Sequence, residues 1–178
     1  MHRAVFLDRD GVLNRSIIHD GKPYPPCAVE EFALYPEVPE ACRQLKEAGF
    51  LLVVVTNQPD VGRGTLLQEV VETIHGRLMT ELPVDRVEVC YDPGNGPPSP
   101  FRKPAPGMII KAARELSIDL SKSFMVGDRW RDIDCGHAAG CTTIFIDRGY
   151  AEELKQKPHF RAGNLAEAAR IILEHAKE

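Results

Sequence analysis

Long hydrophobic runs are absent from this chain of 178 residues. No apolar stretch approaches the roughly 20 residues that a membrane-spanning helix needs, so the sequence predicts no such helix. The opening residues Met1-His2-Arg3 pass directly into a strand-like segment, without the pattern of a signal peptide. The five cysteines are scattered and form no Cys-x-x-Cys pair. We therefore expect no disulfides and a cytoplasmic protein.

Basic residues are fewer than acidic ones, with 22 Lys and Arg against 26 Asp and Glu. The formal net charge is −4 and no long basic stretch occurs, which counts against a surface that coats nucleic acid. With 43% hydrophobic and 27% charged residues, the composition is typical of a globular chain that can form one hydrophobic core. No internal repeat is visible, and we expect residues 1–178 to form a single domain.

Strand-like and helix-like segments alternate along the chain, which predicts an α/β fold with a parallel sheet. The expected strands are residues 4–7, 50–55, 87–91, 124–126 and 142–146, and the expected helices are residues 39–48, 65–82, 108–116, 132–139 and 166–176. Between them, the proline-rich segment 92–106 predicts a loop rather than a domain linker, because helix and strand signals resume directly after it.

Two carboxylates follow the first expected strand. Asp8 and Asp10 come directly after an apolar run and are followed by Gly11. At the carboxyl edge of a parallel sheet, this position places both side chains in the crevice where α/β proteins bind ligands. A solvated turn can also produce Asp-x-Asp, but its place after a buried strand favours a nucleophile site assisted by a metal ion.

Polar groups also follow three later segments of the chain. Because parallel strands all end on the same side of a sheet, these groups can converge with Asp8 and Asp10 on one crevice. Each segment alone is ordinary, and their joint occurrence after successive strands is what indicates a site. The three segments are Thr56-Asn57-Gln58, Arg102-Lys103-Pro104 and Gly127-Asp128-Arg129, the last followed by Asp132.

Four motifs resemble the haloacid dehalogenase (HAD) superfamily of phosphohydrolases: FLDRDGVLN, VVTNQ, RKPAPG and MVGDRWRDID, in that order. More narrowly, they are similar to the D-glycero-D-manno-heptose 1,7-bisphosphate phosphatases, with the phosphatase domain of the histidinol-phosphate enzymes next. The resemblance implies a three-layer, Rossmann-like parallel sheet flanked by helices. Outside the four motifs, too little sequence remains between the expected strands and helices to form a cap, so we expect no large cap domain.

The resemblance also implies catalytic roles. Asp8 is expected to be the nucleophile that forms an aspartyl-phosphate. Asp10 is expected to act as the general acid and then the general base, with a raised pKa, and to bind the metal through its backbone carbonyl. Asp128 and the Asp8 carboxylate are expected to hold Mg²⁺. Thr56 and Lys103 are expected to stabilise the phosphoryl oxygens.

Substrate-binding residues are likewise implied by the family pattern. Asn57, Gln58, Arg102 and Arg129 match contacts to phosphate and sugar. Arginines also occur at positions 9, 15, 63 and 131, in or beside the motif loops of an otherwise acidic chain. A basic rim of this kind suits a small metabolite with a second anionic group, such as a bisphosphate. Asp132 is expected to orient Lys103 or a metal-bound water.

One departure from the family pattern concerns zinc. The related enzymes usually carry a Cys/His loop before Arg-Lys-Pro, whereas residues 90–101 hold one cysteine and no histidine. A tetrahedral zinc site cannot be built from that set, so a structural zinc is not expected.

Several alternatives remain open. The substrate can be heptose bisphosphate, histidinol phosphate, another small metabolite or a nucleic-acid end, and another acceptor can replace water in the second step. A non-catalytic binding module on the same fold is also possible in principle, although the intact Asp8, Asp10 and Lys103 argue against it. The apolar stripes of the long and final helices fit either the core or a subunit contact, so we expect a monomer or a weak dimer.

Overall fold

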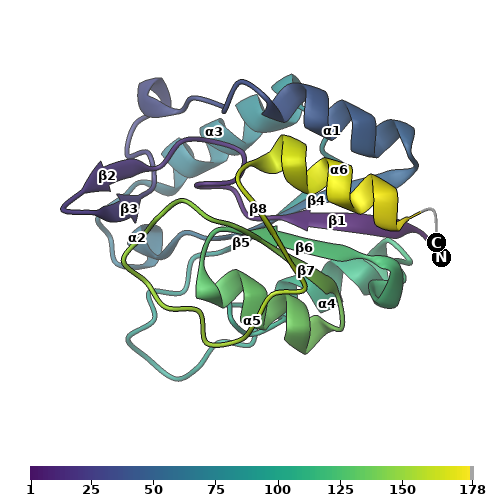
Figure 1. Ribbon diagram of the computed structural model, residues 1–178. Helices are drawn as coiled ribbons and strands as arrows, with labels where there is room; N and C mark the ends of the chain where they lie inside the picture. Colours follow the sequence, from purple (N-terminus) through teal and green to yellow (C-terminus); the bar gives the residue numbers. More distant parts are fainter. Residues whose placement is uncertain (177–178) are drawn as a thin grey trace.

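A six-stranded parallel sheet forms the centre of the computed structural model, which describes residues 1–176 (Figure 1). Every pairing between neighbouring strands of this sheet is parallel. In spatial order the strands are β5 (Arg86–Cys90), β4 (Phe50–Asn57), β1 (Arg3–Leu7), β6 (Phe124–Gly127), β7 (Thr142–Ile146) and β8 (Phe160–Ala162).

Helices cover both faces of the sheet and give three layers (Figure 1). On one face lie α1 (Val38–Glu47), α3 (Gln68–Glu81) and α6 (Leu165–His175), and on the other lie α4 (Gly107–Glu115) and α5 (Trp130–Ala139). This arrangement confirms the predicted α/β class. None of the helices within residues 1–176 is long and apolar enough to cross a membrane.

The remaining elements are small. They are the hairpin of β2 (Ile17–His19) and β3 (Lys22–Tyr24), the short helix α2 (Pro59–Gly62), and the 3₁₀ turns η1 (Val29–Glu31) and η2 (Leu120–Lys122). No large cap domain is present in the described part of the chain, as the sequence predicts.

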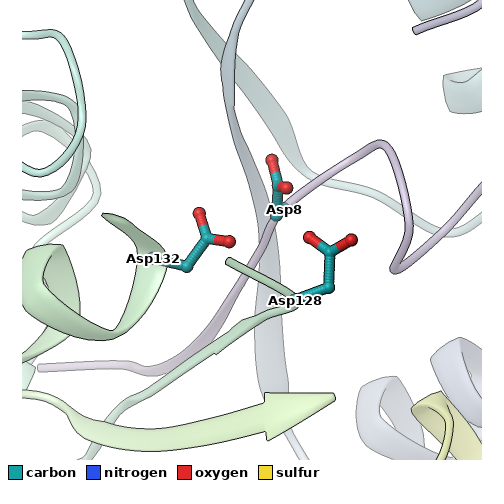
Figure 2. Close-up of side chains that lie close together, drawn as sticks. All are labelled: Asp8, Asp128 and Asp132. Atoms are coloured by element: carbon teal, nitrogen blue, oxygen red, sulfur yellow. The ribbon is translucent and has the colours of Figure 1, made fainter. Parts of the chain in front are cut away.

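The strand order creates a crevice at the carboxyl end of β1. This strand pairs with β4 on one side and with β6 on the other, so the connections on either side of it depart in opposite directions. Ligands of open α/β sheets bind at such a switch point. Asp8 follows β1, Asp128 follows β6 and Asp132 lies in the first turn of α5, and their carboxylates face a common space (Figure 2).

The main departures from the predicted elements concern the start of α3, residues 17–24 and β8. Helix α3 begins at Gln68 rather than at residue 65, because the backbone of Leu67 is extended. Residues 17–24 form a hairpin whose turn residues, Asp20 and Gly21, both have positive φ. Asp-Gly is typical of such two-residue turns, so this signal in the sequence was readable. Strand β8 has only three residues and had no periodic pattern to reveal it.

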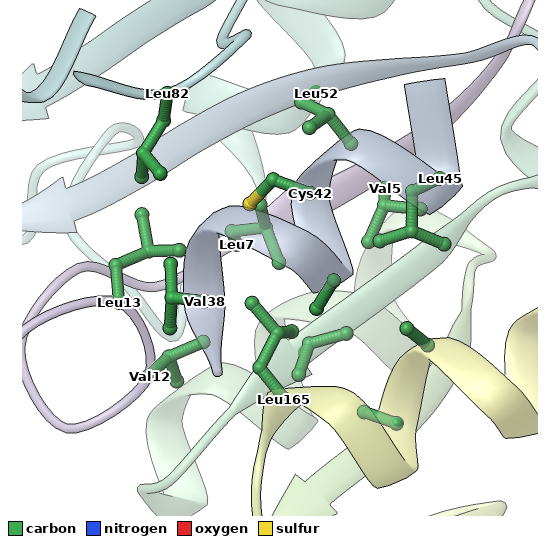
Figure 3. Packing of buried hydrophobic residues seen from close by; sticks show 14 of the residues in the cluster. Val5, Leu7, Val12, Leu13, Val38, Cys42, Leu45, Leu52, Leu82 and Leu165 are labelled. Carbon is green, nitrogen blue, oxygen red and sulfur yellow. The ribbon is translucent and has the colours of Figure 1, made fainter. Parts of the chain in front are cut away.

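The larger hydrophobic core packs between the sheet and the α1–α3–α6 layer (Figure 3). Leu45 of α1, Leu52 of β4 and Leu165 of α6 are fully buried there. Cys42 belongs to the same cluster, and burial raises the pKa of its thiol to about 12. Burial of each leucine contributes about 1.5–3 kcal/mol, so this core stabilises the packing of the helices α1, α3 and α6 on the sheet.

Leu45→Ala is expected to lower the free energy of unfolding by about 2–5 kcal/mol, because it leaves a cavity beneath α1. Urea denaturation followed by circular dichroism measures the change. Ile110→Ala is the matched control, because Ile110 is 48% exposed on α4, and its effect is expected to stay within about 0.5 kcal/mol. Equal losses in the two variants would contradict this assignment of the core.

Candidate active site

Three buried aspartates meet at the carboxyl ends of β1 and β6 (Figure 2). One carboxylate oxygen from each of Asp8, Asp128 and Asp132 lies within 4.8 Å of the others. Three carboxylates in so small a space repel one another unless positive charge is placed among them. The arrangement therefore needs cations from the chain, from a bound ion, or from both.

Lys103 supplies the chain's own cation. Its Nζ atom lies 2.8 Å from Asp8 Oδ1, 2.7 Å from Asp132 Oδ1 and 2.8 Å from the Val55 carbonyl oxygen. An ammonium group has three N–H donors, so all three are used. Although burial alone would lower the pKa of Lys103, the charges of Asp132 and Asp8 outweigh burial and raise it, so the side chain is charged.

Asp132 is held on both of its oxygens. While Oδ1 accepts from Lys103, Oδ2 accepts from the backbone N–H of Arg129 at 3.0 Å, at the start of α5. Residue 127 has no room for a side chain, because a Cβ there would come within 2.1 Å of Asp132 Cβ. The hydrogen bond from Lys103 is the contact through which Asp132 would orient that side chain.

Asp128 has buried oxygens that lack strong partners. Neither oxygen accepts a hydrogen bond of standard geometry within residues 1–176, although the Tyr150 hydroxyl interacts with this carboxylate. Gly11, at φ +85°, lies so close that a Cβ there would come within 1.8 Å of Asp128 Oδ2. A buried, unsatisfied carboxylate beside a second one is a suitable donor set for a hard divalent cation such as Mg²⁺.

The pKa values of the two neighbouring carboxylates reflect the same crowding. Burial, followed by the charge of Asp132, raises the pKa of Asp8 to about 6 even though Lys103 acts in the opposite direction. Burial and the charge of Asp8 raise the pKa of Asp128 well above its ordinary value. A bound cation would relieve both effects, because it favours the charged form of each carboxylate.

Asp10 lies apart from this cluster and is held by neutral amides and an arginine. Oδ1 accepts from Asn14 Nδ2 at 2.9 Å and Oδ2 accepts from Gln58 Nε2 at 2.8 Å. Arg9 donates from Nε and Nη2 to the same carboxylate at 3.0–3.2 Å. The Asp10 carboxylate is thus fixed from three directions.

The expected rise in the pKa of Asp10 is not found. Burial does act to raise it, but the charge of Arg9 and the hydrogen bonds from Asn14, Gln58 and Arg9 outweigh burial and lower the pKa. The expectation assumed that a second carboxylate would be the dominant neighbour. The residue between the two aspartates supplies a cation instead.

Arg9 is completely buried, so it is not part of the basic rim that the sequence suggested. On the side away from Asp10, its Nη1 lies 3.1 Å from Nε2 of His75 in α3. His75 is itself only 8% exposed. Burial, and then the charge of Arg9, lower the pKa of His75 to about 4.

The last residue of β4, Asn57, and the residue after it, Gln58, contact two of the site residues. Asn57 and Lys103 form a reciprocal pair, with Nδ2 of Asn57 donating to the Lys103 carbonyl and Oδ1 accepting the Lys103 N–H, both at 3.1 Å. Gln58 is 1% exposed and also donates to Thr56 Oγ1 at 2.9 Å. The side chains of Asn57 and Gln58 therefore bind Lys103 and Asp10, in addition to any contact with substrate.

A cleft of about 290 Å³ opens above the aspartates. Arg63, Arg102, Arg129 and Arg131 all line it, so these four members of the proposed rim do converge. Arg15 instead lies 6.0 Å from the centroid of the Tyr35 ring. Pro23, Tyr24 and Pro25, in and directly after the β2–β3 hairpin, also line the cleft.

Sequence reasoning missed the loop after β7. Arg148 Nε donates to the Gly11 carbonyl at 2.8 Å, the Tyr150 hydroxyl interacts with Asp128, and Glu152 forms an ion pair with Arg129. The rule that identified the other loops, polar residues directly after a parallel strand, also applies to residues 147–152.

Comparison with known proteins is consistent with this geometry. A family model described as HAD-hyrolase-like matches residues 100–168. The D-glycero-D-manno-heptose-1,7-bisphosphate 7-phosphatase of Thermosynechococcus vestitus is 34% identical, over 97% of this chain and 96% of that protein. The D-glycero-alpha-D-manno-heptose-1,7-bisphosphate 7-phosphatase of Burkholderia mallei is 37% identical, over 82% of this chain and 79% of that protein.

A solved structure is similar along nearly the whole chain. It is the D,D-heptose 1,7-bisphosphate phosphatase of B. bronchiseptica, complexed with magnesium and phosphate. The TM-score is 0.80 at 27% identity, and the match covers 98% of this chain and 99% of that chain.

The lowered pKa of His75 predicts an acid-sensitive contribution to stability. The unfolded chain binds a proton at His75 as the pH falls through 6.5, whereas the folded protein binds it only near 4. Between about pH 7 and pH 4, the wild type is therefore expected to lose about 3 kcal/mol of unfolding free energy relative to His75→Gln. Urea titrations of both proteins across this range measure the difference, and parallel pH curves would contradict the prediction.

Proposed function

Because the chain belongs to the haloacid dehalogenase (HAD) superfamily of phosphatases, in the family of the D-glycero-D-manno-heptose-1,7-bisphosphate 7-phosphatases, we propose that it removes the 7-phosphate of heptose 1,7-bisphosphate. The observation that carries the chemistry is the buried cluster of Asp8, Asp128 and Asp132 around Lys103. The observation that favours a doubly phosphorylated sugar is the set of arginines that line the cleft above it.

Mg²⁺ is the cofactor that fits the donor set. The Asp8 and Asp128 carboxylates would hold it together with the backbone carbonyl of Asp10, and the unsatisfied oxygens of Asp128 support this assignment. When bound, the ion offsets the repulsion between the anionic phosphoryl group and Asp8.

Asp8 is the nucleophile of the first step. One of its carboxylate oxygens attacks phosphorus, the bond from phosphorus to the ester oxygen breaks, and an aspartyl-phosphate forms. The departing alkoxide takes a proton from the Asp10 carboxyl. Approach of the anionic phosphoryl group favours the protonated form of Asp10, which acts against the lowering of its pKa by Arg9.

In the second step, Asp10 acts as the general base. It removes a proton from water, whose oxygen attacks the phosphorus of the aspartyl-phosphate. The bond from phosphorus to the Asp8 oxygen then breaks, which releases inorganic phosphate and regenerates the Asp8 carboxylate. The proton taken from water restores the acid form of Asp10 for the next turnover.

Three groups stabilise the negative charge on the phosphoryl oxygens. Thr56 Oγ1 accepts a hydrogen bond from Gln58, so its own proton remains available for a phosphoryl oxygen. The Asn57 backbone N–H is a second donor, and Lys103, whose three N–H groups are already used, contributes through its positive charge. Preorganised donors of this kind each contribute on the order of 3 kcal/mol to the rate.

The second phosphate of the substrate is assigned to the arginine rim. Arg102, Arg129 and Arg131 line one cleft, and burial together with the charges of Arg129 and Arg102 lowers the pKa of Arg131. An anion placed among them relieves this repulsion, and guanidinium groups bind phosphate in a bidentate manner. Gln58 contributes through Asp10 rather than through the rim.

We infer that residues 1–178 act as one catalytic domain in the cytoplasm, as a monomer or a weak dimer. Specificity then depends on the loops that line the cleft, including the β2–β3 hairpin.

Phosphate release with Mg²⁺ is expected in the wild type and is expected to be lost in Asp8→Asn, which lacks the nucleophile. The panel contains both anomers of heptose 1,7-bisphosphate, histidinol phosphate and a 3′-phosphorylated oligonucleotide. Preference for one heptose bisphosphate supports the whole proposal, whereas efficient turnover of a different ester keeps the mechanism and replaces the substrate. No activity in folded, Mg²⁺-supplied wild type would identify a binding module.

Arg131→Gln is expected to raise the KM for the bisphosphate about tenfold, because it removes one charged partner of the second phosphate. Steady-state kinetics on the bisphosphate and on the corresponding 7-monophosphate separate this effect from a general loss. Arg15→Gln is the control, because Arg15 lies against Tyr35. An equal rise in KM for both substrates would show that Arg131 does not contact the second phosphate.

A further inference from the structure

The Arg9 side chain is a buried link between two distant parts of the chain. It is fully buried, and its Nε and Nη2 atoms donate to the Asp10 carboxylate. Its Nη1 atom reaches in the other direction, to His75 Nε2 at 3.1 Å. His75 is 66 residues away along the chain, on the face of α3 that packs against the sheet.

The chemistry of this contact determines the state of His75. A guanidinium group has only donors, so the Nε2 atom of His75 must be the acceptor. The imidazole is then neutral and carries its proton on Nδ1. Its burial and the adjacent Arg9 charge both oppose protonation.

We propose that His75 is a positioning residue for the proton transfers of this enzyme, acting through Arg9 on Asp10. This inference rests on the proposed function, in which Asp10 protonates the leaving group. By accepting from Nη1, His75 fixes the plane of the guanidinium group, and the fixed plane presents Nε and Nη2 together to the carboxylate.

A neutral acceptor is what this position requires. An apolar side chain would leave a buried N–H of Arg9 without a partner, so the guanidinium would turn to find one. A carboxylate would share the positive charge of Arg9 and weaken its hold on Asp10. Asn14 and Gln58 still bind Asp10 when His75 is lost, so the expected effect is partial.

The test compares His75→Leu, which has no acceptor, with His75→Gln, whose amide oxygen can accept from Arg9. Each is assayed with Mg²⁺ on a sugar phosphate, whose alkoxide leaving group needs a proton, and on p-nitrophenyl phosphate and acetyl phosphate, whose leaving groups depart without one. General acid catalysis contributes only to the first class.

Because the second step uses Asp10 as a base with every substrate, the rate compared is that of the first step, the formation of the aspartyl-phosphate in a single turnover. We expect His75→Leu to lower this rate about tenfold with the sugar phosphate and to leave it within about twofold of wild type with the two activated substrates. His75→Gln is expected to restore most of the lost single-turnover rate. Equal losses on both classes of substrate, or a full loss in His75→Gln as well, would overturn the proposal, because they would indicate a packing role only.

Two controls keep the outcome interpretable. His159→Leu removes another histidine that accepts a hydrogen bond, from the Thr143 N–H at 3.0 Å, and it is expected to keep the wild-type ratio between the substrate classes. Thermal denaturation confirms that each variant is folded at the assay temperature. Turnover of the sugar phosphate by the wild type tests the proposed function separately. If the wild type is active and His75→Leu keeps the wild-type ratio of the rates on the two substrate classes, the inference is wrong and the proposed function stands.

Discussion

The buried ammonium group of Lys103 is the interaction on which the site depends. It binds the nucleophile candidate Asp8, the α5 residue Asp132 and the carbonyl of Val55 in β4. One side chain from the proline-rich loop thereby connects segments that follow or belong to three strands of the sheet. Removing one member of a buried ion pair typically costs about 3–5 kcal/mol, because the remaining charge stays buried without compensation. The positions of all these loops are therefore coupled.

Charge balance explains why two aspartates of one motif behave differently. Burial and then the charge of Asp132 raise the pKa of Asp8, and the single cation Lys103 does not offset them. Asp10 is two residues away but faces Arg9 and two amides, and its pKa is lowered. A bound cation would lower the pKa of Asp8, and an anionic phosphoryl group would raise that of Asp10, so each would move toward the protonation state that a nucleophile and a general acid need.

Prediction from the sequence was correct for elements that carry a continuous apolar pattern. The five longer strands and the positions of Asp8, Thr56, Lys103 and Asp128 at one end of the sheet were all predicted, because apolar runs mark buried strands and parallel strands end on one side. It failed for β8, whose three residues carry no periodicity. It also missed the loop of residues 147–152, where the same rule applies but no family motif drew attention to it.

By itself, the sequence determined which segments form the five longer strands, which reactive groups the chain carries and which chemistry these groups can perform. Only the tertiary structure decided which arginines line the cleft and which one is buried. Arg9 and Arg102 have the same side chain, yet Arg9 is enclosed between Asp10 and His75 while Arg102 lines the cleft. The direction of each pKa shift was decided in the same way, because burial and charge partners come from segments far apart in the chain.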